Sequence, residues 1–386
     1  MGNKLTMDKI IKTTDDRELW QPFLLKNIKA WYKILTKNKL STAGVEIIHE
    51  TESQLEELYQ LRNPKTRFQG EFKKEATMFA QIYLPQIKWF YFPWLKKIVS
   101  FLPEKMHNEL RTGRNRNLIT AKEQEKFYNS HVAILGMSVG SHVALTITLT
   151  GGSKFLSLAD PDRISGSNIN RIRTGFYNLG INKTKAVARQ IFEINPYSKI
   201  KIYPEGINDS NLKKLLTNKI DLLIEETDSP YLKLKVREMA KPLGIPVIMA
   251  ADNADGIIVD VERYDQNKKL PILHGILGKM TSEQFKLIAP RNLPKTMAKI
   301  AGAHLSTVRM LESVLEVGNT IYSWPQLGSA ATLCGSVLAN IARKILLNQP
   351  IKSGRFDINI DTFLVGKENK KTKKQKNVLL KKIGAI

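Results

Sequence analysis

The stretch His131-Val-Ala-Ile-Leu-Gly136-Met-Ser-Val-Gly140-Ser141 begins with an apolar run and passes into a glycine-containing turn. The apolar run predicts a buried strand, and the small and apolar residues from His142 to Leu149 predict a buried helix after the turn. Gly151-Gly152 ends this helix, and Phe155-Leu-Ser-Leu-Ala159 has the composition of a second strand. The sequence therefore predicts a βαβ unit at its centre.

The same alternation of strands and helices continues after Pro196. Further strands are predicted at 200–203, 221–226 and 245–250, and further helices at 210–217 and 231–240. This order predicts an α/β fold with a doubly wound, mostly parallel sheet, a Rossmann-like variant whose ligand crevice lies at the carboxyl ends of the strands. Gly136, Asp160 and Asp228 all fall at such ends.

The glycine turn does not by itself establish nucleotide binding. No placement of the G-x-G-x-x-G pattern fits, because the third glycine falls on Ser141 when the pattern starts at Gly136, and the first falls on Leu135 when the pattern ends at Gly140. Glycine also serves tight strand-to-helix turns for backbone reasons. Asp160, however, lies about twenty residues beyond the turn, where such folds place an acid that accepts hydrogen bonds from ribose hydroxyls.

Several polar residues follow at fixed spacings. They are Asp160-Pro-Asp162, Asn168 eight residues after Asp160, Arg171 eleven residues after it, Gly180-Ile-Asn-Lys183, and Asp228 at the end of Asp221-Leu-Leu-Ile-Glu-Glu-Thr-Asp228. In these motifs the chain resembles the ThiF/MoeB family of adenylating enzymes, which are related to ubiquitin-activating proteins. The resemblance extends at least from Arg111 to about Leu347 and implies the same Rossmann-like module.

The resemblance assigns roles to these residues. It implies that Asp160, the first acid of the pair with Asp162, binds ribose, and that Asn168, Arg171 and Lys183 approach the phosphates. It also implies that Asp228 holds Mg²⁺, so that ATP and Mg²⁺ are the expected cofactors. The backbone around Gly136, Ser138 and Gly140 would approach the nucleotide. Arg171, Lys183 and Asp228 would then stabilise charge during adenylation of a carboxylate, with release of pyrophosphate.

An arginine-rich segment, Arg111-Thr-Gly-Arg114-Asn-Arg116, precedes the first strand of the βαβ unit. In the ThiF/MoeB family, one arginine of such a segment reaches across a dimer interface toward the ATP phosphates. The resemblance therefore implies a homodimer in which Arg116, or alternatively Arg114, is a catalytic residue. A solvent-exposed basic linker is the alternative interpretation.

The chain has a single cysteine, Cys334, inside an apolar helix predicted at 327–347. We interpret it as a buried small residue. Ubiquitin-activating relatives carry a catalytic cysteine in a loop, and many family members carry zinc-binding C-x-x-C pairs; neither feature occurs here. A narrower resemblance, carried by the turn, the arginine segment and Phe192-Glu-Ile-Asn-Pro196, is to a bacterial ThiF-like subgroup that is sometimes fused to a nitroreductase-like domain.

Composition limits the classes of partner. Of 386 residues, 42% are hydrophobic, and 60 Lys and Arg against 36 Asp and Glu give a formal charge of +24. Residues 367–386 contain eight lysines and one glutamate, a block that is usually solvated and disordered, although such a block also suits nucleic acid or anionic lipid. Since no nucleic-acid-binding motif is present, nucleic acid is not an expected partner. The sequence shows no signal peptide, so a cytoplasmic protein is expected.

Three regions are predicted: a helical N-terminal region at 1–110, an adenylation domain at 111–350 and a basic tail at 351–386. Near-helical spacing of apolar residues from Trp20 to Trp31 predicts one helix, and Glu50 to Arg62 predicts a second. The apolar segment from Ile82 to Leu102 is interrupted by prolines and lysines, so no transmembrane segment is expected. This segment is interpreted as core or a dimer contact, with an interfacial membrane anchor as the alternative.

Two other functions stay open on the sequence alone. A dinucleotide-dependent oxidoreductase would use the same βαβ unit and Asp160, and a non-catalytic binding module would keep the fold without the reaction. Asp252 and Asp255 are candidate substrate contacts or turn-forming residues. His274 lies in an apolar context and is interpreted as a hydrogen-bonded core residue. The expected substrate carries a carboxylate, on a ubiquitin-like C-terminus, a peptide or a small acid.

Overall fold

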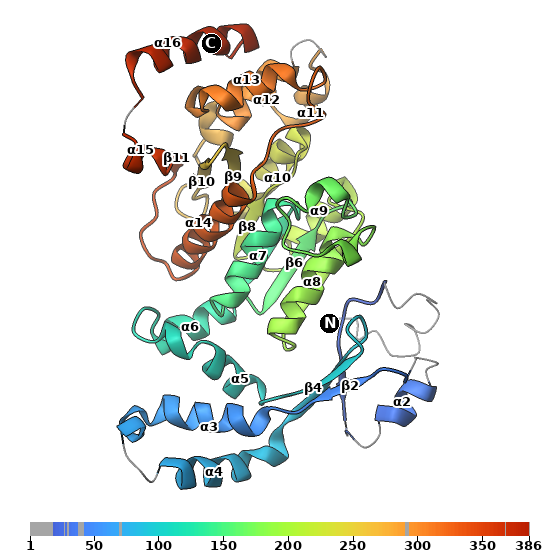
Figure 1. Ribbon diagram of the computed structural model, residues 1–386. Coiled ribbons are helices and arrows are strands. Elements are labelled where there is room, and N and C mark those ends of the chain that lie inside the picture. The colour runs from blue at the N-terminus through green and yellow to red at the C-terminus, as the bar shows by residue number, and fades with distance from the viewer. Residues whose placement is uncertain are drawn as a thin grey trace. The chain divides into compact units, whose positions relative to one another are not determined.

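The computed structural model describes residues 18–26, 28, 31–37, 42–68, 72–289, 293–366 and 368–385. The chain divides into two compact units, each with its own sheet (Figure 1). The first unit comprises Met1–Glu125 and Ala188–Ser198, and the second comprises Lys126–Val187 and Lys199–Ile386. Within the described part of the chain, none of the helices combines the length and apolar character that a membrane crossing requires.

The second unit contains a seven-stranded sheet in the order β11-β10-β9-β8-β5-β6-β7. Strands β5 to β9 pair in parallel, and β10 and β11 are added antiparallel at one side. The predicted doubly wound, mostly parallel sheet is therefore confirmed. The strands are β5 (His131–Leu135), β6 (Phe155–Ala159), β7 (Lys199–Tyr203), β8 (Leu222–Glu225), β9 (Val247–Asn253), β10 (Gly256–Glu262) and β11 (Gly354–Ile358).

Helices cover both faces of this sheet. Helix α7 (Val139–Leu149) follows the glycine turn and packs against α14 (Gly328–Leu346), the predicted closing helix, which also contacts β9 and β10 (Figure 1). Helices α9 (Asp209–Leu216) and α10 (Pro230–Leu243) share a buried core with Ala133 and Leu135 of β5. The unit also contains α8 (Lys183–Ile194, which continues into the first unit), α11 (Ser282–Lys286), α12 (Leu293–Ala301), α13 (Val308–Glu316), α15 (Asp361–Leu364) and α16 (Lys370–Ile383).

The first unit differs from the predicted helical region because it contains a four-stranded sheet. Its strands, in the order β1-β3-β4-β2, are β1 (Phe23–Leu25), β3 (Lys88–Phe92), β4 (Lys97–Phe101) and β2 (Glu46–Ile48). The helix predicted from Trp20 to Trp31 is wrong. Leu25 is buried and the neighbouring Leu24 is 58% exposed, which is the alternation of a strand rather than the period of a helix.

Other predictions for the first unit are confirmed. Helix α3 (Thr51–Arg62) forms where predicted, with Leu55 and Leu58 fully buried. The apolar segment from Ile82 to Leu102 forms the β3–β4 hairpin, whose Tyr91 and Ile98 belong to a buried cluster, so this segment is core. The remaining helices are α2 (Trp31–Lys37), α4 (Phe72–Tyr83), α5 (Glu104–Arg111) and α6 (Ala121–Tyr128, which enters the second unit).

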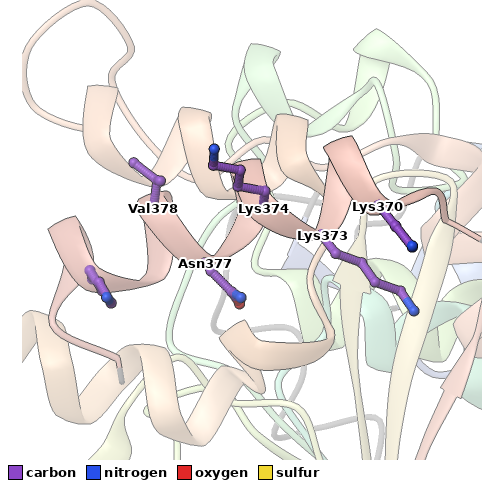
Figure 2. A pocket seen from close by; sticks show the side chains of 6 residues that line it. Lys370, Lys373, Lys374, Asn377 and Val378 are labelled. Atoms are coloured by element: carbon purple, nitrogen blue, oxygen red, sulfur yellow. The ribbon is translucent and has the colours of Figure 1, made fainter.

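The basic tail is folded over most of its length, contrary to the prediction. Helix α16 begins after Asn369, whose side chain accepts a hydrogen bond from the backbone N–H of Thr372. Leu379 and Leu380 are buried in a cluster shared with α12 and α13. The lysines lie elsewhere on the helix, where Lys370, Lys373, Lys374 and Lys381 line a surface hollow (Figure 2). The lysines therefore leave one side of α16 apolar, and this side packs against α12 and α13.

Candidate functional site

In the glycine turn after β5, a side chain at either glycine would collide with neighbouring atoms. Gly136 has a φ of +89°, and a Cβ there would lie 2.3 Å from the carbonyl oxygen of Glu226. A Cβ at Gly140 would lie 2.8 Å from Cγ2 of Ile134. The turn can therefore bring the start of α7 close to β5 and to the chain that follows β8. The N-terminus of α7, with Ser138 and Val139, lines a cavity.

Asp160, at the end of β6, is bound to this turn. Its Oδ2 accepts a hydrogen bond of 2.6 Å from the backbone N–H of Met137, and its Oδ1 accepts one of 2.8 Å from the N–H of Asp162. Burial raises the pKa of Asp160, while Lys183, whose Nζ lies 3.8 Å from Oδ2, acts in the opposite direction. The structure thus fixes the orientation of the predicted ribose-binding carboxylate.

Lys183 begins α8 and lies beside both acids of the predicted pair. Its Nζ donates to Oδ2 of Asp162 at 2.7 Å, and its side chain is only 8% exposed. The Asn182 side chain holds the preceding turn by donating to the backbone carbonyls of Asp160, Asp162 and Pro204. A nearly buried ammonium group beside a cavity suits a bound anion.

Arg171 and Asn168 come from the segment between β6 and α8. Arg171 Nε donates to Oγ of Ser138 at 3.0 Å, and its Nη1 donates to Oδ1 of Asn170 at 2.9 Å. Burial lowers the pKa of Arg171, whereas Asp252 and Asp228 raise it. Asn168 is 9% exposed, and its Oδ1 accepts from the backbone N–H of Ser165, so the side chain has a fixed orientation. Both residues line the cavity.

Asp228 follows β8 and also lines the cavity. Its side chain is exposed, and no described residue donates a hydrogen bond to it. The described residues contain no group of three side chains placed to hold a metal ion. A single free carboxylate facing a phosphate-binding cavity nevertheless fits Mg²⁺, which is commonly bound through one or two carboxylates together with substrate phosphates and water.

One cavity of about 450 Å³ brings most of the predicted site together. It lies at the carboxyl ends of β5, β6, β8 and β9, as the sequence predicts for such sheets. Gly136, Gly140 and Asp160 support the turn and Lys183 without lining the cavity themselves. The predicted residues that do line it are Ser138, Asp162, Asn168, Arg171, Lys183 and Asp228.

The cavity also contains charged residues that the sequence analysis missed. Glu226 and Lys233 line it, together with Asp252, which was predicted as a possible substrate contact. Asp252 accepts a hydrogen bond of 3.0 Å from Nε2 of Gln326. The sequence did contain a sign of Glu226, because two glutamates end the apolar run of β8. Charged residues are rarely buried unless they are paired, so glutamates at the end of a buried strand indicate either a partner or a site.

Arg116 and Arg114 belong to the first unit. Arg116 Nη2 lies 3.1 Å from Oε1 of Glu109, and its Nη1 donates to the backbone carbonyl of Leu61. Arg114 is exposed. These contacts describe the segment within its own unit, and the predicted phosphate-binding role of Arg116 stays a prediction.

Cys334 is buried as predicted, whereas the His274 side chain is 20% exposed and therefore lies at the edge of the core rather than inside it. Cys334 is fully buried in α14, its Sγ donates to Oδ1 of Asp252 at 3.4 Å, and burial raises the pKa of the thiol well above its usual value. Such a thiol is a poor nucleophile. His274 Nε2 lies 3.2 Å from Oδ1 of Asp260, a buried carboxylate that also binds Arg355.

The parallel sheet, the glycine turn and the cavity at the strand ends define a Rossmann-like α/β protein. Residues 112–379 match the model of the ThiF family, and the chain belongs to this family. The resemblance seen in the residues from Asp160 to Asp228 is thereby confirmed.

Individual relatives cover parts of the chain. An uncharacterised protein of Mycobacterium tuberculosis, MT1398, is 33% identical over 277 residues, which are 72% of this chain and 38% of that protein. The adenylyltransferase and sulfurtransferase UBA4 of Vanderwaltozyma polyspora is 28% identical over 33% of this chain and 29% of its own length. The chain thus spans less than two fifths of either relative.

Solved structures that match part of the chain include PaaA and Escherichia coli MccB with ATP. PaaA has a TM-score of 0.47 at 19% identity and covers 66% of this chain and 77% of its own. MccB has a TM-score of 0.46 at 18% identity and covers 74% of this chain and 76% of its own.

Proposed function

We propose that this chain is an ATP-dependent adenylyltransferase that activates a carboxylate as an acyl adenylate. A carboxylate oxygen of the substrate attacks the α-phosphorus of ATP and forms a new P–O bond. The bond between the α-phosphorus and its bridging oxygen to the β-phosphate breaks, and pyrophosphate leaves. The observation that carries the proposal is the convergence of Asn168, Arg171 and Lys183 on one cavity at the strand ends.

This reaction asks the protein mainly to position two anions and to stabilise the charge that develops between them. Arg171 would offer its planar guanidinium to phosphate oxygens, and Lys183 would supply a compact positive charge. Asn168 would add a neutral hydrogen bond. Asp160, held by the backbone of the turn, keeps lone pairs for ribose hydroxyls.

Asp228 would hold Mg²⁺ together with phosphate oxygens, because its carboxylate faces the cavity and receives no hydrogen bond from the described residues. When bound, the ion would supply neutralisation of phosphate charge. Arg116 would complete the phosphate site from a second copy of the chain, which makes the active form a homodimer.

The acyl acceptor lies outside this chain. Cys334 is the sole cysteine of the sequence, it is buried, and its pKa is raised, so a thioester on this residue is not part of the proposal. The acyl adenylate would therefore pass to a separate acceptor.

Thermal unfolding with ATP and Mg²⁺, set beside NADH, NADPH and FAD, tests nucleotide choice without knowledge of the substrate. A ligand at a hundred times its Kd stabilises the folded state by about 2.7 kcal/mol. Stabilisation by ATP alone supports the proposal. Stabilisation by a nicotinamide or flavin cofactor instead favours an oxidoreductase, in which Asp160 would serve the same ribose role. No stabilisation by any nucleotide favours a binding module.

Variants of the cavity test the reaction. Arg171→Ala and Asp228→Ala should each lower carboxylate-dependent ATP–pyrophosphate exchange by about 10²–10³-fold, the scale of losing one charge-stabilising group. Both should keep a wild-type circular dichroism spectrum, because the hydrogen-bonding partners of Arg171 are neutral groups. Arg173→Ala, a nearby exposed arginine that does not line the cavity, is the matched control and should retain exchange. Normal exchange in both cavity variants would refute the assignment.

A further inference from the structure

The strand order places the predicted ligand groups along one line. The acid Asp160 follows β6, the glycine turn follows β5, Asp228 follows β8, and β9 comes next, in the order β6-β5-β8-β9. Neighbouring strands lie about 4.8 Å apart, so the ends of β6 and β9 are separated by roughly 14 Å. With ribose at β6 and phosphates at β5 and β8, the cavity continues on the far side of the phosphates, at β9.

The cavity changes character at that point. Beyond β9 its wall is built by α12, α13 and the end of α16, and every described residue that these three helices contribute is apolar. We call this part of the cavity the apolar chamber. Three of its residues, Ile300, Met310 and Leu311, are at most 9% exposed. The chamber residues used below are Met297, Ile300, Met310, Leu311, Val314 and Ile383.

The chamber lies next to a polar boundary. Asp252, near the end of β9, interacts electrostatically with Arg171 and accepts a hydrogen bond from Gln326. Asp252 and Gln326 both line the same cavity as the chamber residues. A molecule with its carboxylate at Arg171 would therefore extend its remaining atoms past this boundary, toward α12 and α13.

We propose that the acid activated by this chain is a small carboxylic acid with an apolar aliphatic or aromatic body that fills the apolar chamber. This inference rests on the proposed adenylation. Apolar walls gain free energy when an apolar group replaces water, and they penalise polar groups that find no hydrogen-bond partner. A flexible tail ending in Gly-Gly has no side chains and would leave the chamber unfilled.

A homologous series of acids tests the proposal. ATP–pyrophosphate exchange is measured with straight-chain acids from acetate to decanoate, with phenylacetate, with the polar acids glycine and succinate, and with a peptide ending in Gly-Gly. KM should fall about fourfold for each added methylene until the chamber is full, the ratio that corresponds to ~0.8 kcal/mol per buried CH₂. The proposal would be overturned if KM did not depend on chain length, or if the polar acids or the peptide supported exchange better than the apolar acids.

Two variants tie chain-length preference to the chamber. Val314→Phe reduces its volume and should shift the preferred acid to a shorter chain, whereas Met310→Ala enlarges it and should shift the preference to a longer one. Arg309→Phe introduces the same aromatic ring at an exposed position of α13 and should leave the preference unchanged. Unchanged preference in both chamber variants would contradict the proposed location.

Calorimetric titration of decanoate separates the two proposals, since it needs no reaction. If decanoate binds wild type and binds Val314→Phe at least tenfold more weakly while no acid supports exchange, the chamber is right and adenylation is wrong. If exchange occurs only with the peptide or the polar acids, adenylation stands and the chamber proposal fails. Absence of decanoate binding to the wild-type protein with ATP and Mg²⁺ present also overturns the chamber proposal.

Discussion

Two consecutive glutamates at the end of β8 lie in opposite environments. Glu225 accepts a hydrogen bond of 2.8 Å from Nη1 of Arg237, and Nζ of Lys233 lies 3.2 Å away. Glu226 accepts from the backbone N–H of Ala250 at 2.8 Å and faces the cavity. Burial alone would raise the pKa of both. Lys233 and Arg237 outweigh burial and lower the pKa of Glu225, whereas the pKa of Glu226 lies well above its usual value.

The difference separates charges that hold the fold from charges that are available to a ligand. Arg237 bridges Glu225 and Glu262, and all three side chains are 0% exposed. Tyr264 donates a further hydrogen bond to Glu262. In the cavity, by contrast, all the hydrogen-bond acceptors of the Arg171 side chain are neutral. Its positive charge therefore stays available to an anionic ligand. The paired charges of Arg237 and its two glutamates are structural, whereas Arg171 at the strand ends has no acid among its hydrogen-bond partners.

Breaking the buried network should have the largest effect on stability. Arg237→Met leaves Glu225 and Glu262 buried without their shared cation, and removing one member of a buried ion pair costs about 3–5 kcal/mol. The free energy of unfolding, measured by urea denaturation at pH 7, should fall by that amount. The exposed pair of Lys286 and Glu283 supplies the control, because Lys286→Met should leave the free energy of unfolding unchanged. Equal losses in both variants would contradict the comparison.

Lys183 should have an intermediate effect because it is nearly buried and also faces the cavity. Lys183→Met removes the cation beside Asp160 and should lower the free energy of unfolding by about 1.5–3 kcal/mol, the range for a hydrogen bond to a charged group. It should also abolish stabilisation by ATP in thermal unfolding. Asp162→Asn is the matched control: its side chain is 64% exposed, and Lys183 keeps Asp160, so the loss should be smaller. A larger loss for Asp162→Asn would show that Lys183 is held chiefly by the exposed acid.

Much of the second unit could be predicted because its signals are local. A buried parallel strand is a continuous apolar run, and β5, β6 and β8 form at such runs. The residues from Asp160 to Lys183 lie in one continuous segment that follows β6, and their spacing carries the family resemblance. Their grouping around a cavity follows directly from the parallel order.

Other features depend on contacts between distant segments, and no local pattern reveals them. The apolar chamber combines Met297, Met310 and Ile383, which become neighbours only when α12, α13 and α16 pack together. Strand β1 has three residues, too few to show alternation against the helical spacing around it. The lysines of α16 dominate its composition, although Leu379 and Leu380 decide its packing.

The smallest expected effect distinguishes the two glutamates of β8 by the sign of their pH dependence. The folded pKa of Glu226 lies well above the usual glutamate value of 4.5, so the folded state binds this proton more tightly than the unfolded state. The corresponding contribution to stability is fully present below pH 4.5 and is lost as pH rises through the folded pKa. Glu226→Gln keeps an acceptor for Ala250 and removes the titration. The free energy of unfolding of this variant should equal that of wild type below pH 4.5 and exceed it at pH 7.

Glu225→Gln should change stability in the opposite direction. The folded pKa of Glu225 is lowered, so its contribution is present above pH 4.5 and is lost as pH falls through the folded pKa. This variant should therefore be less stable than wild type at pH 7, and the difference should shrink in acid. Urea denaturation of both variants from pH 4 to pH 8 gives the two curves. If both variants changed the free energy of unfolding in the same direction at pH 7, the cations of α10 would act on both carboxylates alike. The division between structural and available charge at the end of β8 would then be wrong.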